Sequence, residues 1–192
     1  YLKSGVNQGV PITYYELFAS GTPVVIAKTI VSADDYLVKA QEAVEPHTII
    51  RFADQSLALR ASSKGYFIRG NAKSDLKDYQ GAIADLDQAI ELDPKCQFAL
   101  SPNGIESSCL YSRGSTKYFS KDYQGAIADI SKVIAIDPQD GDAYYARGKA
   151  KSKSGDRQGA IADLDKVIEL SPRYSQAYVF RGAIKADLKD YY

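Results

Sequence analysis

The chain has 192 residues, of which 45% are hydrophobic and 25% are charged, so it can bury a continuous core and does not have the composition of a disordered protein. Its 24 basic and 24 acidic side chains balance, which argues against a nucleic-acid partner, because phosphate binding needs an excess of Lys and Arg. Its apolar stretches are far shorter than the roughly 20 residues of a membrane span, so we expect a soluble, cytoplasmic protein without membrane insertion.

Residues 1–62 are expected to be degenerate helical repeats or an N-terminal flanking region. The chain contains no Met and its first residues lack the pattern of a secretory signal, so we interpret both ends as cut. Residues 8–9 followed by Tyr14–Leu17 resemble the second helix of a degenerate repeat. Pro11 would lie in the first turn of this helix and Gly21 at its C-terminal cap.

The stretch from Tyr15 to Val25 has a second interpretation. Its order Glu-Leu-Phe-Ala-Ser-Gly-Thr-Pro-Val-Val is similar to a helix–loop–strand stretch of nucleotide-sugar-dependent glycosyltransferases, in which the Glu, here Glu16, contacts the donor ribose. The upstream strands and the basic phosphate-binding residues of that family are missing from the sequence. This resemblance implies that the chain is an appendage of a larger enzyme, with the catalytic part before Tyr1.

Residues 33–61 are expected to form a degenerate helical hairpin. Apolar residues recur at helical spacing from Leu37 to Val44, and Asp54–Leu59 resembles Asp87–Leu92 further along the chain. His47 is the only histidine, and we place it in a solvated loop between the two helices rather than in a catalytic site.

From residue 63 onwards the sequence repeats itself. The segment Asp78–Pro94 recurs as Asp122–Pro138 and as Asp156–Pro172, and the last two copies begin 34 residues apart. Apolar residues in each copy fall on one face of a helix, and the Pro ends that helix. An Arg-Gly pair, preceded by an aromatic residue, stands upstream of each copy and indicates an earlier helix. Each unit is therefore predicted to be two antiparallel helices.

The predicted units span residues 63–94, 107–138, 141–172 and 175–192, of which the last is truncated. An insertion at 95–106 lengthens the interval between the first and second units. These inserted residues are either a loop that contacts a ligand at the edge of the binding surface or a surface loop without a binding role.

Cys96 and Cys109 bracket the insertion, and Ser101–Gly104 inside it has the composition of a turn. A disulfide between the two cysteines would join the two ends of the insertion. The interpretation that we favour is two separate thiols, one of them packed as a small hydrophobic side chain.

The period of 34, the order aromatic, Gly, Tyr, Ala, Ala, Pro, and the two helices per unit resemble the tetratricopeptide repeat (TPR). This resemblance implies an all-α fold, a right-handed α-solenoid of antiparallel helix hairpins. It also implies a non-enzymatic scaffold that binds a peptide or protein segment in its concave groove, which is lined by the first helix of each unit.

The groove positions of the family can be transferred to the matching positions of this chain. They are Phe67, Asn71, Ser74, Asp75, Tyr111, Ser115, Tyr118, Phe119, Tyr145, Lys149, Ser152 and Lys153, followed by Val179, Ala183 and Ala186. The aromatic residues and the two lysines suit a peptide with apolar anchors and an acidic group. The carboxylate clamp of the chaperone-tail binders in this family keeps only Asn71, so that ligand is disfavoured.

The Arg before each Gly departs from the family pattern, in which an apolar residue is commoner at this position. Because an Asp recurs in step on the second helix, we expect one ion pair inside each hairpin. The expected pairs are Arg69 with Asp85, Arg113 with Asp129, and Arg147 with Asp163. Arg181 is expected to lack its partner. The alternative is a basic ladder for an acidic ligand.

The sequence carries no motif for catalysis, a cofactor or a metal. Cys-x-x-Cys, His-Glu-x-x-His and Gly-x-x-x-x-Gly-Lys-Ser spacings do not occur. We therefore expect no cofactor and no bound metal, and we expect the partner to be a protein or a peptide. Self-association through exposed repeat ends, here Asp190–Tyr192, is a further option.

Overall fold

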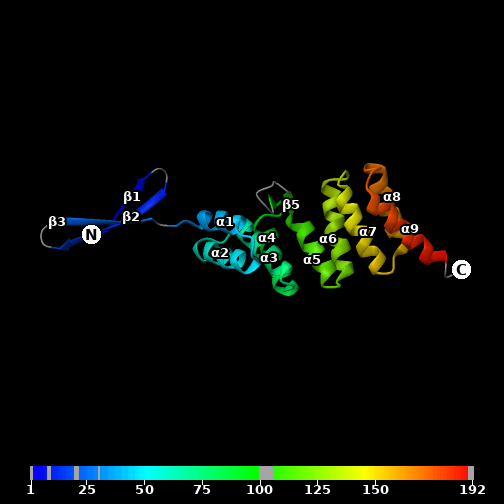
Figure 1. Cartoon of the computed structure of the whole chain (residues 1–192), viewed down its shortest axis with the longest axis horizontal. Coiled ribbons are helices and arrows are strands. Elements are labelled where there is room, and N and C mark those ends of the chain that lie inside the picture. Colours follow the sequence, from blue (N-terminus) through cyan, green and yellow to red (C-terminus); the bar gives the residue numbers. More distant parts are fainter. Residues whose placement is uncertain (1, 8–9, 20–21, 30, 100–105, 190–192) are drawn as a thin grey trace.

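The protein is an elongated array of helices with a small sheet at its N-terminal end (Figure 1). The computed structural model describes residues 2–7, 10–19, 22–29, 31–99 and 106–189. Within this part, no helix is both long enough and apolar enough to span a membrane.

Nine helices in the described residues follow one another along the array. They are α1 (Ala33–Glu42), α2 (Pro46–Leu59), α3 (Ser63–Asp75), α4 (Tyr79–Leu92), α5 (Cys109–Phe119), α6 (Tyr123–Ile136), α7 (Gly141–Lys153), α8 (Arg157–Leu170) and α9 (Ser175–Lys189). Each helix packs against the next along the chain, so the core is continuous from one hairpin to the following one. This arrangement confirms the predicted α-solenoid of helical hairpins.

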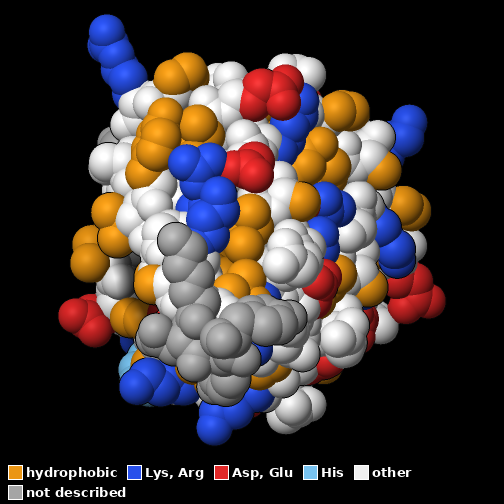
Figure 2. Space-filling model, turned by 90° about the vertical axis from the view of Figure 1, so that its right-hand side faces the viewer, with side chains coloured by type: hydrophobic (Ala, Val, Ile, Leu, Met, Phe, Trp, Pro, Cys, Tyr) orange, Lys and Arg blue, Asp and Glu red, His pale blue; other side chains and the backbone are white. Residues whose placement is uncertain are grey.

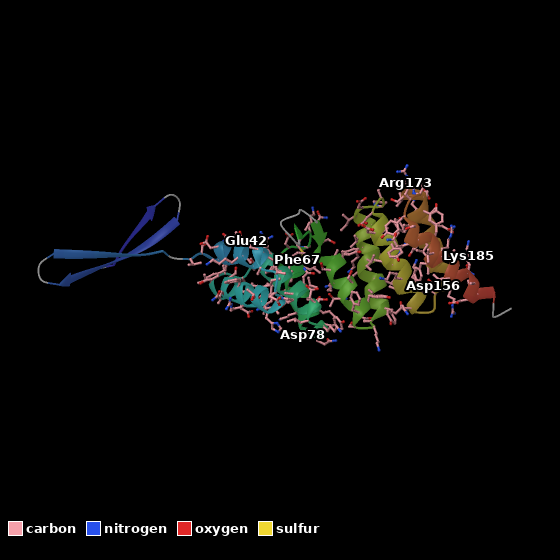
Figure 3. The ribbon with its side chains drawn as sticks, viewed as in Figure 1. Glu42, Phe67, Asp78, Asp156, Arg173 and Lys185 are labelled. Carbon is pink, nitrogen blue, oxygen red and sulfur yellow. A yellow bond between two sulfur atoms is a disulfide. The ribbon has the colours of Figure 1, made fainter. Side chains whose placement is uncertain are left out.

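The turns inside the hairpins are built from a recurring cap. Asp78, Asp122 and Asp156 precede the second helix of their hairpins, and each carboxylate accepts a hydrogen bond from the backbone three residues later. Lys77 and Gly155 adopt positive φ angles of 64° and 95° just before such a cap. In Figure 3, Asp78 lies at the lower edge of the array and Arg173 at the upper edge, so turns within and between hairpins alternate between edges.

Small residues let the two helices of a hairpin approach closely. A Cβ atom on Gly114 of α5 would lie 2.8 Å from Cγ1 of Ile130 on α6. A Cβ atom on Gly148 of α7 would lie 3.4 Å from the carbonyl oxygen of Ala160 on α8, which is an ordinary contact. Both glycines therefore lie where the two helices of a hairpin meet, and the space is tighter at Gly114.

The N-terminal strands contradict the helix that we predicted there. The strands are β1 (Leu2–Asn7), β2 (Val10–Ala19) and β3 (Thr22–Thr29), paired antiparallel in the order β1-β2-β3. Pro11 lies in β2 and not in the first turn of a helix, because β-branched and aromatic residues favour extended backbone here.

The second interpretation of this stretch is also wrong. Tyr15 pairs with Ile26 across β2 and β3, where the glycosyltransferase resemblance required a helix followed by a strand. Residues 8–9 and Gly21, which we placed around the helix, and residues 190–192, which we considered for self-association, lie outside the described residues.

The helices α1 and α2 form the first hairpin of the array. Ser32 caps α1 through a capping box, in which its Oγ accepts from the backbone of Asp35 and its own backbone N–H donates to the Asp35 carboxylate at 2.7 Å. Pro46 starts α2. His47 is exposed in the first turn of α2, so its predicted place in a loop is wrong.

The insertion between the second and third hairpins contains two short strands. These are β4 (Gln97–Ala99) and β5 (Glu106–Ser108), which pair antiparallel. Cys96 and Cys109 flank them and form a disulfide, which contradicts our expectation of two separate thiols. The predicted turn at 101–104 lies outside the described residues.

Candidate functional site

A hollow of about 480 Å³ opens between three first helices at the C-terminal end of the array. It is lined by Tyr118 of α5, by Tyr145, Lys149 and Lys153 of α7, and by Ser175, Gln176, Val179, Phe180 and Ala183 of α9. Figure 2 looks onto this end of the molecule and shows hydrophobic side chains next to Lys and Arg side chains. We call this hollow the C-terminal groove.

Aromatic rings surround the Lys149 ammonium group in the C-terminal groove. Its Nζ atom lies 5.2 Å from the ring centroid of Tyr118 and 5.9 Å from that of Tyr145. The Tyr145 ring also packs against Tyr174 and Phe180, with centroid distances of 5.3 and 6.3 Å. Cation–π contacts of this kind hold the ammonium group in place without neutralising its charge.

Neither lysine of the C-terminal groove forms an ion pair with a carboxylate in the part of the chain that the structure describes. Lys149 is partly buried and Lys153 is exposed. The groove therefore combines two unneutralised cations with an aromatic wall, which is the combination that binds a carboxylate beside an apolar side chain.

The Arg and Lys side chains that recur in α3, α5 and α7 form ion pairs inside their hairpins. Each of the three expected Arg–Asp pairs is present, with two hydrogen bonds of 2.6 to 2.9 Å between guanidinium and carboxylate. A lysine one turn later completes each pair, namely Lys73 with Asp85, Lys117 with Asp129 and Lys151 with Asp163. These Arg and Lys side chains bind this protein's own buried carboxylates, so they do not form the basic ladder that we considered.

Burial and ion pairing shift the pKa of Asp129 in opposite directions. The side chain of Asp129 is only 3% exposed, and burial by itself would raise its pKa. The hydrogen bonds from Arg113 and Lys117 outweigh burial, so the pKa of Asp129 lies below its ordinary value of 3.8. The same pairing raises the pKa of Arg113.

The same arginines also connect successive hairpins, which we did not predict. The Nη1 atom of Arg69 contacts Asp54 on α2 at 2.7 Å, and that of Arg113 contacts Asp87 on α4 at 2.6 Å. Arg181 forms an ion pair with Asp165 on α8, so the expectation that it lacks a partner is wrong. The reason is that two second helices carry an Asp two residues after the paired one, namely Asp87 and Asp165, and this Asp faces the following hairpin.

The remaining predicted groove residues are spread along the array. Phe67, Asn71 and Asp75 line a second hollow of about 220 Å³ between α1 and α3. Phe67 is fully buried in the core, so it is not a surface contact. The predicted residues that line neither hollow are Ser74, Tyr111, Ser115, Phe119, Ser152 and Ala186.

Family comparison places this array among known repeats. Residues 63–96 match one family model described as tetratricopeptide repeat, and residues 107–140 and 141–174 match another with the same description. Together they cover more than half of the chain. The chain belongs to the tetratricopeptide repeat family. Proteins built of TPR units are typically non-catalytic scaffolds for protein interactions, and the described residues contain no group of His, Cys, Asp and Glu that could hold a metal ion.

Solved TPR structures share this fold. MamA from Desulfovibrio magneticus RS-1 is 22% identical, with 82% of this chain and 86% of that chain covered and a TM-score of 0.71. YrrB, described as a TPR protein with an unusual peptide-binding site, is 18% identical, with 78% and 71% covered and a TM-score of 0.63. The first TPR domain of Spaghetti (RPAP3), bound to the HSP90 peptide SRMEEVD, is 22% identical, with 67% and 94% covered and a TM-score of 0.57. No curated protein sequence matches the chain.

The transfer of TPR groove positions missed three residues of the C-terminal groove. Ser175, Gln176 and Phe180 lie in the first turns of α9, outside the positions that we transferred. A signal for one of them was available, because Phe180 stands where the preceding unit has the much smaller Ala146. An aromatic residue at a position of small residues indicates that the space next to it is filled differently in this unit.

Proposed function

We propose that this TPR array binds a peptide segment of a partner protein along its first helices, with the C-terminal groove as the main contact. The observation that carries this proposal is that the two lysines of the groove lack ion-pair partners. Lys149 and Lys153 have no carboxylate partner among the described residues, whereas the cations beside them in the hairpins are paired.

Different side chains of the C-terminal groove contact different parts of the bound peptide. An apolar side chain of the peptide packs against Tyr145 and Phe180, which are already held in place by contact with each other. A carboxylate of the peptide pairs with Lys149, whose ammonium group is positioned by the rings of Tyr118 and Tyr145. Buried aromatic anchors contribute more than about 1 kcal/mol each, and exposed ion pairs up to about 1 kcal/mol.

Two solved relatives support a peptide as the ligand, since one is bound to a peptide and the other is described by its peptide-binding site. The chaperone-tail ligand of the first relative is not part of our proposal. Of the carboxylate clamp that such a tail requires, this chain keeps only Asn71.

Peptide selection followed by groove mutations tests the proposal. Peptides selected from a random display library on the full chain are synthesised with a fluorescent label, and their affinities are measured by anisotropy. We expect Tyr118→Ala and Lys149→Glu each to weaken binding by about tenfold, because each removes part of the aromatic and cationic wall.

Matched controls separate the groove from the rest of the surface. Lys132→Glu makes the same charge change at an exposed position of α6, and Tyr178→Ala removes an aromatic ring that is 43% exposed on α9, outside the groove. Both controls are expected to bind the selected peptides as the wild type does. Selected peptides that bind both groove variants as tightly as the wild type would show that the groove is not the binding site.

A further inference from the structure

The last residue of successive first helices changes its chemical character along the array. Asp75 ends α3, Phe119 ends α5 and Lys153 ends α7. These three residues occupy the same position of the repeat, and all three are exposed. The row therefore presents an acidic, an aromatic and a basic side chain in that order. We call it the end row.

The two charges of the end row are not neutralised by the protein itself. Neither Asp75 nor Lys153 forms an ion pair within the described residues, although Lys73 on α3 and Lys151 on α7 each pair with an Asp of the following helix. Burial raises the pKa of Asp75, and no cation is among the causes that act on it. Asp75 borders the hollow between α1 and α3, and Lys153 borders the C-terminal groove, so both face space for a ligand.

The middle of the end row is apolar and held in place. The side chain of Phe119 is 58% exposed. Its ring stacks on that of Tyr79 at 6.4 Å and meets the edge of Tyr118 at 5.5 Å. A ring that is supported on two sides and open on the third offers a preformed contact for an apolar side chain.

We infer that the end row recognises an extended peptide whose basic, apolar and acidic side chains face Asp75, Phe119 and Lys153 in turn. This inference rests on the proposed function and adds the chemistry and order of the ligand. Charge complementarity selects this ligand, because a like charge at either end would meet the same charge on the protein.

The spacing of the helices sets the spacing of the ligand side chains. The helices α3 and α5 touch through a 3.2 Å hydrogen bond between Thr116 and Ser74, and α5 and α7 touch through Tyr118 and Lys149. Neighbouring helices pack about 10 Å apart, and an extended chain of the polyproline II type advances about 3.1 Å per residue with about three residues per turn, so side chains three residues apart lie on one face. The three recognised side chains are therefore about three residues apart.

Three short synthetic peptides test the end row. Each has charged residues near both ends and a central Leu, separated by pairs of Ser, with blocked termini so that only side chains carry charge. The mixed peptide carries Lys and Glu, the second peptide carries Lys twice, and the third carries Glu twice. Anisotropy at low salt is expected to show that the full chain prefers the mixed peptide about fivefold over each of the others.

Charge reversals in the protein are expected to change this preference predictably. Asp75→Lys is expected to prefer the peptide with two Glu residues, and Lys153→Glu the peptide with two Lys residues. Phe119→Ser weakens all three peptides alike, and Lys132→Glu leaves the order unchanged. Because these positions are exposed, circular dichroism melting is expected to show an unchanged fold.

The inference about the end row would be overturned if the wild type and both charge-reversal variants bound the three peptides in the same order of affinity. If the display-selected peptides still depended on Tyr118 and Lys149 in that case, the proposed function would stand without it. If those peptides did not depend on Tyr118 and Lys149 either, both proposals would be wrong.

Discussion

The Nη1 atom of Arg113 on α5 lies 2.6 Å from the Oδ1 atom of Asp87 on α4, so this ion pair joins two successive hairpins. The same guanidinium group makes two hydrogen bonds to Asp129 on α6, inside its own hairpin. One arginine therefore connects three helices. A lysine could not replace it, because its single ammonium group lacks the planar fork that reaches two carboxylates at once.

The two carboxylates on Arg113 differ in burial, and this predicts different costs of removal. The side chain of Asp129 is 3% exposed and that of Asp87 is 52% exposed. Asp129→Asn is expected to lower the free energy of unfolding by about 3 kcal/mol, because it leaves Arg113 and Lys117 without their buried partner. Asp87→Asn is expected to cost about 0.5 kcal/mol. Urea denaturation measures both, and equal losses would contradict this assignment.

The lowered pKa of Asp129 predicts a loss of stability in acid. Its pKa in the folded protein lies below the ordinary 3.8 because hydrogen bonds from Arg113 and Lys117 outweigh burial. A carboxyl group with a depressed folded pKa stabilises the protein above its unfolded pKa and loses this contribution as the pH falls through the folded pKa. The stability difference between wild type and Asp129→Asn is therefore expected to shrink below pH of about 4. A difference that stays constant from about pH 5 to pH 2 would argue against it.

Two equivalent glycines predict opposite responses to alanine. At Gly148 the added Cβ makes an ordinary contact 3.4 Å from Ala160, so Gly148→Ala is expected to be neutral or to stabilise by up to about 1 kcal/mol through helix propensity. At Gly114 the Cβ would lie 2.8 Å from Ile130, which is buried and cannot move aside, so Gly114→Ala is expected to destabilise by about 1 kcal/mol. Thermal melting of the two variants measures the difference, and an equal shift in both would contradict it.

The disulfide predicts a redox-dependent stability. Cys96 and Cys109 are 13 residues apart in sequence, and closing a loop of this size stabilises a protein by about 3 kcal/mol in the chain-entropy treatment. A reducing agent is expected to lower the melting temperature of the wild type and to leave a variant with both cysteines changed to Ala unaffected. Two titratable thiols in the unfolded, unreduced wild type would show that the bond is absent.

The sequence predicted the parts of this fold that recur. The Arg-Gly pair of the first helix and the Asp that pairs with its Arg appear at matching positions of three units, so a single physical explanation served all of them. The partner of Arg181 was missed because we looked for it only inside the hairpin. Asp165 lies in the preceding hairpin, on the part of α8 that contacts α9.

The parts that occur once were harder to predict. Residues 10–19 have no second copy, so Pro11 and the tyrosines nearby gave a helix by loose resemblance where the backbone is a strand. Phe67 was placed on the groove surface by its position in the repeat, but its bulk fits the core between α1 and α3. Repeat position predicts which way a residue points, and packing decides how much of it remains exposed.

One junction between hairpins is built differently from the others. Between α6 and α7, Arg147 donates to the neutral Ser131 hydroxyl at 3.2 Å, where other junctions use a carboxylate. A neutral acceptor holds a guanidinium group about half as strongly as a charged one. Tyr118 and Tyr145 stand on opposite sides of this junction. The polar link between hairpins is therefore weakest at this seam, and we expect small changes in its width to alter the space between the two rings and so to admit guests of different thickness.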